Sequence, residues 1–298
     1  MFTIWRVIVL FLLIGPSFGL PPLRGMVPRG RTRPHPNKAG STNEKFHNCN
    51  AYKWDVYHGA NGGIGRAVAE ILAADHHYHV VIGSRSLAAG QDVADSLKSR
   101  GLLASAVQLD LTVDADILAA AAYISETFGK LDVLVNNAAV HFDVRHSLSV
   151  REQWTSTFAT NVVGTAVLTD KLLSLLRKSE FPRIVFVSST KGSMGAALDT
   201  TLAFQDLAFN PYDASKAAVN MLTIGYAKGL KDVGGVANAV CPGLVDTKMT
   251  ASMGEEILAS HGAASPELGA RRIVEMATLE KRSGVSATFS SRNGTIPW

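Results

Sequence analysis

Short apolar segments that alternate with longer helix-like segments limit most strongly what this chain can fold into. The apolar runs are HVVIGS (79–84), SAVQLDL (105–111), LDVLVNN (131–137), RIVFVSS (183–189) and GVANAVCPG (235–243). The helix-like stretches span 65–75, 87–100, 114–128, 151–178 and 212–231. Strands separated by helices of this length form βαβ units with parallel strands. We therefore predict a single α/β domain of three layers, with helices covering both faces of a parallel sheet.

The first 50 residues differ from the rest of the chain in composition. An apolar run from Val7 to Ile14 is followed by Ser17 and Gly19, at the small-residue spacing that a signal peptidase prefers. Because this run is short for a membrane span, we predict a cleaved signal peptide over 1–19. A wrongly joined first exon on a cytosolic enzyme has almost equal weight, so the compartment is either the secretory pathway or the cytoplasm.

The segment after the apolar run predicts a linker. Residues 20–50 are rich in Pro, Gly and Arg and show no apolar period, which is typical of disorder, so the folded domain is expected over 51–298. Residues 1–43 carry six basic residues and no acid, whereas the whole chain has 29 Lys and Arg against 25 Asp and Glu. The domain itself is thus nearly neutral, and a nucleic-acid partner is not expected.

A glycine-rich loop lies in YKWDVYHGANGGIG (52–65). Gly59, Gly63 and Gly65 form GxxxGxG, with Asn61 and Ile64 between them, directly before the helix-like stretch RAVAEILAA. Glycines permit a tight turn and a close approach of a pyrophosphate, and the helix N-terminus supplies N–H donors. On its own, this motif is weak support for a dinucleotide site.

The segment before this loop is a poor strand. Asp55 and His58 interrupt KWDVYH (53–58), where an apolar run is expected. We still predict that this segment enters the sheet at its centre, because the glycine loop needs a strand to anchor it. Residues 1 to about 50 are then dispensable for the fold, and dinucleotide binding is weakened.

Tyr212 and Lys216 form the strongest chemical pair in the sequence. They lie four residues apart at the start of a helix-like stretch, so their side chains share a face. A nearby ammonium favours phenolate and is expected to lower the pKa of Tyr212 toward the working pH of a proton donor. No metal site is expected, because His76, His77 and His79 lack a Cys or carboxylate at ligand spacing.

The order of motifs resembles that of the short-chain dehydrogenase/reductase family over 52–298. The motifs are GxxxGxG, NNAA (136–139), VSS (187–189), Tyr212-x-x-x-Lys216 and Pro242-Gly243. This resemblance implies a Rossmann-type doubly wound sheet. The 22 residues between Ser189 and Tyr212 also resemble the monomeric carbonyl reductase branch, so a monomer is expected, with a dimer as the alternative.

The resemblance also implies roles for individual residues. The catalytic set is Asn161, Ser189, Tyr212 and Lys216: Ser189 positions the substrate oxygen, Tyr212 exchanges the proton, and Lys216 binds the cofactor ribose. Asn161 is expected to hold a water that links Lys216 to solvent. Two features depart from the family, since His58 stands where a threonine usually precedes the first glycine and Ala139 ends the NNAA motif.

Cofactor choice depends on the end of the second predicted strand. VVIGSRS ends in Ser84 and Arg85, which suit a 2′-phosphate, whereas an acid would bind a ribose 2′-hydroxyl. We therefore expect NADP(H) rather than NAD(H). By resemblance, Asp110 approaches the adenine, Asn136 the adjacent ribose side, and Thr247 the carboxamide of the nicotinamide.

These inferences predict an NADP(H)-dependent carbonyl reductase or alcohol dehydrogenase acting on a small molecule. Hydride passes between the nicotinamide and the carbonyl carbon of a ketone or aldehyde. The alternative is a catalytically weak or silent nucleotide-binding protein of the same fold, which the poor strand at 53–58 favours.

Overall fold

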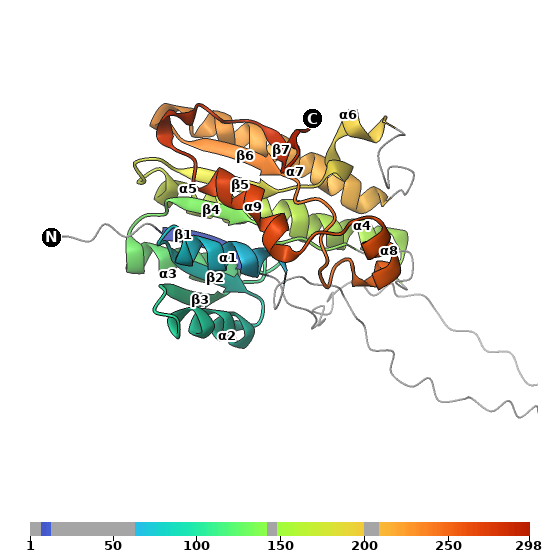
Figure 1. The fold of residues 1–298 in the computed structure, drawn as a ribbon. Coiled ribbons are helices and arrows are strands. Elements are labelled where there is room, and N and C mark those ends of the chain that lie inside the picture. Colours follow the sequence, from blue (N-terminus) through green and yellow to red (C-terminus); the bar gives the residue numbers. More distant parts are fainter. Residues whose placement is uncertain (1–6, 13–62, 142–147, 200–208) are drawn as a thin grey trace, which may run out of the picture. The chain divides into compact units, whose positions relative to one another are not determined.

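A computed structural model describes residues 7–12, 63–141, 148–199 and 209–298. These residues form an eight-stranded sheet in the order β3-β2-β1-β4-β5-β6-β7-β8 (Figure 1). All neighbouring strands are parallel except β7 and β8. The strands are β1 (Val7–Leu12), β2 (His79–Ser84), β3 (Ala104–Gln108), β4 (Val133–Asn136), β5 (Arg183–Val187), β6 (Val236–Val240), β7 (Phe289–Ser291) and β8 (Gly294–Thr295).

Helices cover both faces of this sheet, as the alternating strands and helices predict (Figure 1). One face packs against α1 (Ile64–Ala74), α2 (Leu87–Lys98) and α9 (Pro266–Ala277). The other packs against α3 (Asp114–Phe128), α5 (Thr165–Leu176) and α7 (Asn210–Gly229). Successive residues of β2 serve opposite faces, since Val80 and Ile82 join the first core and Val81 the second. The three-layer α/β prediction is confirmed.

Shorter helices complete the described chain. They are α4 (Val150–Phe158), the π-helix η1 (Ala159–Gly164), the 3₁₀ turns η2 (Thr190–Gly192), η3 (Lys231–Val233), η4 (Ala251–Met253) and η5 (Lys281–Ser283), α6 (Met194–Ala197) and α8 (Glu255–Ser260). Within the described ranges, no helix is both long and apolar enough to cross a membrane.

The central strand is the largest departure from the sequence-based predictions. Val7–Leu12 pairs with β2 on one side and with β4 on the other, so Val9 stands opposite both Val81 and Leu134. The prediction that 53–58 takes this place is therefore wrong, as is the prediction that all of residues 1–50 are dispensable. The run VIVLFL suits a strand covered by helices on both faces, whereas an Asp and a His in KWDVYH do not.

This placement also bears on the predicted leader. Cleavage after residue 19 would remove the strand that joins β2 to β4. The described residues all belong to one compact unit, which includes Val7–Leu12. The predicted linker at 20–50, the segment 53–58, Gly59 and Asn61 all lie outside the described residues.

Candidate active site

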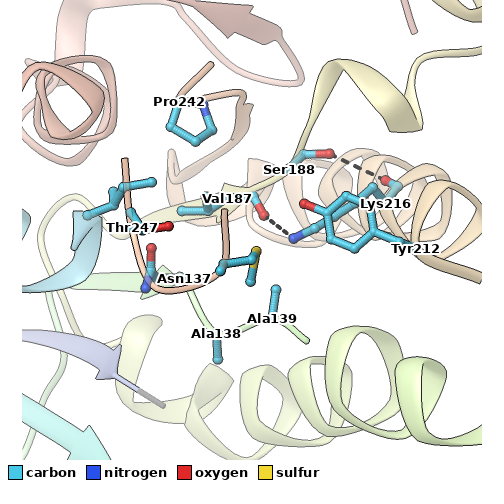
Figure 2. A pocket seen from close by; sticks show the side chains of 11 residues that line it. Asn137, Ala138, Ala139, Val187, Ser188, Tyr212, Lys216, Pro242 and Thr247 are labelled. Carbon is cyan, nitrogen blue, oxygen red and sulfur yellow. Dashed lines mark hydrogen bonds between the residues drawn. The ribbon is translucent and has the colours of Figure 1, made fainter. Parts of the chain in front are cut away.

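A pocket opens where the central strands end. Parallel α/β sheets bind ligands outside the carboxyl ends of their strands, next to the point where the strand order reverses, which here lies between β1 and β4. Figure 2 shows the side chains that line the pocket. They are Ile64 of α1, Asn137, Ala138 and Ala139 after β4, Val187 and Ser188 at the end of β5, Tyr212 and Lys216 of α7, and Pro242, Thr247 and Met249 after β6.

The glycine loop reaches this pocket through its last residues. Gly63 has a φ of 119°, in the region that favours glycine, and a Cβ there would lie 3.4 Å from Thr247 Cγ2. Gly63 is the N-cap residue of α1 and has no side chain that could accept a hydrogen bond from the first N–H groups of the helix. Among the described residues, the backbone at Gly63 and the free N–H groups that begin α1 fit a pyrophosphate. Gly65 is buried within α1.

Tyr212 lies in the first turn of α7, with its ring at the pocket. Burial raises the pKa of its hydroxyl, the Cys241 thiol nearby raises it further, and a hydrogen bond from Ser189 lowers it. The prediction that Lys216 lowers the pKa of Tyr212 is therefore wrong for this structure. Desolvation outweighs the neighbouring groups, so Tyr212 keeps its proton at neutral pH.

Lys216 is buried beside Tyr212, with 2% of its surface exposed. Its Nζ donates to the Val187 carbonyl oxygen at 2.7 Å and lies 5.5 Å from the centroid of the Tyr212 ring (Figure 2). Burial lowers the pKa of Lys216 to about 8. This ammonium can therefore exchange a proton near neutral pH.

The two serines after β5 point to different partners. Ser188 Oγ donates to Asn220 Oδ1 at 2.6 Å and contacts the Lys216 carbonyl oxygen at 3.4 Å. The Ser189 side chain instead bonds Tyr212, and its Oγ accepts from the Lys191 N–H at 3.2 Å. The alternation of side chains along the strand thus brings Ser189, as predicted, and not Ser188 to the Tyr212 hydroxyl.

Asn161 lies in the π-helix η1, which interrupts the helix predicted over 151–178. Its Oδ1 accepts from the Val140 N–H at 2.7 Å, and its Nδ2 donates to the Val140 carbonyl at 2.9 Å and to Ser215 Oγ at 3.0 Å. Ser215 Oγ in turn donates to the Tyr212 carbonyl at 2.7 Å. Asn161 therefore ties the segment after β4 to the first turn of α7. π-helical turns of this kind are frequent at functional sites.

The ends of β2 and β3 place two opposite charges near one another. Arg85 follows β2 and is partly buried, and burial lowers its pKa while the charge of Asp110 raises it. Asp110 Oδ1 accepts from the N–H and hydroxyl of Thr112 at 2.8 and 2.7 Å. Ser84 does not join them, because its buried side chain packs against Gly90 of α2. The expectation that Ser84 suits a phosphate is thus not met.

The NNAA motif contributes its second asparagine to the pocket. Asn136 is buried and its Nδ2 donates to Thr169 Oγ1 of α5 at 3.1 Å, so its side chain faces away from the predicted ribose. Asn137 lines the pocket instead. Sequence reasoning missed Asn137, although the alternation of side chains already implied that only one of the pair could face the pocket.

His141 and Phe209 were also missed. His141 follows the NNAA motif by two residues, and its ring lies against the rings of Phe209 and Tyr212 at centroid distances of 4.7 and 5.2 Å. No spacing rule pointed to these residues. They come together only because the end of β4 meets the start of α7.

The sequence model described as short chain dehydrogenase matches residues 53–258. The chain belongs to the short-chain dehydrogenase/reductase family. This short-chain dehydrogenase/reductase is therefore an oxidoreductase that uses a nicotinamide cofactor, NAD or NADP, on small-molecule substrates. The match begins beyond Val7–Leu12, so the central strand lies apart in sequence from the matched region.

Curated relatives agree with this assignment. The short-chain dehydrogenase anuI of Penicillium roqueforti is 33% identical over 225 residues, covering 74% of this chain and 86% of the relative. The short-chain dehydrogenase/reductase ATR10 of Stachybotrys chlorohalonatus is 34% identical over 249 residues, covering 80% and 88%. The 3-oxoacyl-[acyl-carrier-protein] reductase FabG of Pseudomonas aeruginosa is 31% identical, covering 66% and 75%.

A solved structure shares the fold. The crystal structure of gox2181 superposes with a TM-score of 0.68 at 21% identity, covering 78% of this chain and 90% of that one. The Rossmann-type prediction is confirmed.

Proposed function

We propose that this short-chain dehydrogenase/reductase is an NADP(H)-dependent carbonyl reductase. The observation that carries the proposal is the grouping of Tyr212, whose ring lines the pocket, with Ser189, which hydrogen-bonds it, and with the buried Lys216, whose Nζ lies 5.5 Å from the centroid of the Tyr212 ring. A protonated phenol is the state needed to reduce a carbonyl, because the oxygen must receive a proton as the carbon receives a hydride.

The bound nicotinamide supplies the hydride for this reaction. Ser189 orients the carbonyl oxygen, and Tyr212 gives it a proton, so that the C=O group becomes a CH–OH group. Lys216, with its pKa of about 8, gives a proton to the Tyr212 phenolate and regains one from solvent, and it would hold the cofactor ribose. Asn161 links the start of α7 to the segment after β4, and this link holds the first turn of α7, which carries Tyr212, in place at the pocket.

The preference for NADP(H) rests on Arg85. A guanidinium at the end of β2 is placed to bind a 2′-phosphate with charge-assisted hydrogen bonds. Asp110 limits the gain, since the phosphate must compete with an acid already near the guanidinium. A ribose 2′-hydroxyl carries no charge, so it gains less from Arg85 than a 2′-phosphate does, and the arrangement favours NADP(H).

Reduction is the proposed direction. The relatives include proteins named as reductases, among them the FabG proteins of three bacteria. The alternative of a silent nucleotide-binding protein loses its main support, because that support was the poor strand at 53–58 and the apolar segment Val7–Leu12 takes the central place. The preference for a monomer stays a prediction.

The test is a screen for NADPH and NADH oxidation against ketones, aldehydes and quinones. The proposal predicts turnover of at least one class, with a higher kcat/KM for NADPH than for NADH. NADPH binding without turnover of any class would favour the silent alternative.

We also propose that the mature protein keeps Val7–Leu12. Intact mass and N-terminal sequencing of the protein from its native cells test this proposal. A mature N-terminus near residue 20 would restore the predicted leader and contradict the central strand.

A further inference from the structure

Three aromatic rings meet at the first turn of α7. The His141 ring makes edge-to-face contacts with Phe209, at 4.7 Å and an interplanar angle of 90°, and with Tyr212, at 5.2 Å and 79°. Neither His141 nor Phe209 lines the pocket, whereas Tyr212 does. Edge-to-face geometry is the preferred arrangement for such rings, so each contact favours one orientation of the Tyr212 ring.

The backbone next to His141 is anchored by the side chain of Asn161. The preceding residue, Val140, has both its N–H and its carbonyl bonded to the side chain of Asn161. The same amide donates to Ser215 Oγ, which bonds the Tyr212 carbonyl. The backbones that carry His141 and Tyr212 are thus linked through two buried side chains, those of Asn161 and Ser215.

Phe209 is held by two neighbouring charged side chains, Asp213 and Lys191. Its N–H donates to Asp213 Oδ2 at 3.1 Å, and Asp213 pairs with Lys191 at 3.6 Å. The Lys191 ammonium also lies 5.6 Å from the centroid of the Phe209 ring. Phe209 therefore offers His141 a surface whose position is set by its contacts with Asp213 and Lys191.

The Tyr212 ring needs such support. A tyrosine side chain turns about two torsions, and fixing its backbone leaves the hydroxyl free to swing away from Ser189. We propose that His141, braced by Phe209, is a positioning residue that holds the Tyr212 ring so that its hydroxyl stays at Ser189. This proposal rests on the proposed carbonyl reductase activity. It assigns the effect to the shape of the imidazole ring, and not to proton transfer by it.

The test compares His141→Ala with His141→Phe in the full chain. A misplaced catalytic group costs about 10- to 100-fold in rate, so His141→Ala should lower kcat by that factor and leave KM for NADPH within about twofold. His141→Phe keeps a flat ring and should restore kcat to within about threefold of the wild type. A His141→Ala variant with unchanged kcat, or a His141→Phe variant as slow as His141→Ala, overturns the proposal.

His79→Ala is a matched control. His79 also makes an edge contact with an aromatic ring, that of Phe128 at 4.8 Å and 64°, but it begins β2 at the edge of the sheet opposite to the pocket. Its loss should affect thermal stability and leave kcat unchanged. An equal fall in kcat for His79→Ala would show a general loss of packing and contradict the assigned role.

An activity-independent measurement separates this proposal from the proposed function. In tyrosine-labelled protein, NMR resolves the ring signals of the six tyrosines, and Tyr212→Phe identifies that of Tyr212. We expect its ring-flip rate to rise in His141→Ala and to return in His141→Phe. If no carbonyl is reduced but these NMR changes occur, the function fails and the positioning stands. An unchanged ring-flip rate of Tyr212 in His141→Ala overturns the positioning, whatever the activity.

Discussion

The carboxyl edge of the sheet has two ends that hold their polar side chains differently. At the Tyr212 end, formed by the ends of β4, β5 and β6, buried side chains bond one another and the backbone, as Asn161 and Lys216 do. At the Arg85 end, formed by the ends of β2 and β3, a partly exposed guanidinium lies near the carboxylate of Asp110. The hydrogen bonds at the Tyr212 end hold their side chains in place before a ligand binds. At the Arg85 end, an anionic ligand can compete with Asp110 for the guanidinium.

This difference separates two tasks. Proton transfer requires hydroxyl groups held within tenths of an ångström, which buried hydrogen bonds supply. Discrimination between two cofactors requires only a charged side chain that binds one of them more tightly than the other. Changes at the Tyr212 end should therefore alter rate, and changes at the Arg85 end should alter cofactor preference.

The strand between the two ends should give the largest effect. Val9→Pro removes an N–H from the middle of β1, which pairs with strands of both ends. We expect a loss of about 3 kcal/mol or more in unfolding free energy, and loss of both rate and cofactor binding. Val56→Pro, in the segment 53–58, should stay within about 0.5 kcal/mol of the wild type. Urea denaturation compares the two, and the reverse order of stabilities would return the central place to 53–58.

Removing the proton donor should affect the Tyr212 end alone. Tyr212→Phe keeps the ring and loses the hydroxyl, so kcat should fall by about 10²- to 10⁴-fold while NADPH binding stays nearly unchanged. Steady-state kinetics and a fluorescence titration with NADPH measure the two quantities. Retention of more than about a tenth of the wild-type kcat means that Tyr212 is not the acid.

How far the sequence predicted these residues differs between the two regions. Tyr212, Lys216, Ser189 and Asn161 were found because their motifs are local, and the structure brings all four together. The pKa of Tyr212 was predicted with the wrong sign, because burial depends on distant elements that pack over the ring.

The central strand could not be assigned from the sequence for a different reason. A short apolar run has no period, so VIVLFL fits a buried strand and a signal peptide equally well. Only pairing with β2 and β4 distinguishes them. The same limit applies to Asn136 and Asn137, since alternation says that their side chains diverge but not which one faces the pocket.

A buried ammonium gives a pH-dependent effect at the Tyr212 end. The pKa of Lys216 is lowered from 10.5 to about 8, so its charge costs stability below pH 8, and this cost fades as the pH rises toward 10.5. Lys216→Met removes the cost together with the activity. The free energy of unfolding of Lys216→Met minus that of the wild type should be larger at pH 7 than at pH 10. The expected change in this difference is on the order of 2 kcal/mol.

Urea denaturation of the wild type and of Lys216→Met at both pH values measures this difference, and other titrating groups cancel between the two proteins. A difference in stability that does not change with pH would show that Lys216 is not a buried ammonium in solution.

At the Arg85 end, we expect an effect on one kinetic constant only. Arg85→Ala should raise KM for NADPH by about 5- to 150-fold, equivalent to about 1–3 kcal/mol for a lost charge-assisted contact. KM for NADH and kcat with saturating cofactor should change little. Equal losses for both cofactors would remove the 2′-phosphate role and the contrast between the two ends.

The most direct test of the account follows the hydrogen atoms themselves. A ketone found by the screen is reduced with NADPH in which both hydrogens at C4 of the nicotinamide are replaced by deuterium, and the alcohol is analysed by mass spectrometry and NMR. The account predicts one deuterium on the carbinol carbon with the wild-type protein, and almost no alcohol with Tyr212→Phe. An alcohol without deuterium at that carbon, or equal yields from the two proteins, would contradict hydride transfer with Tyr212 as the proton donor.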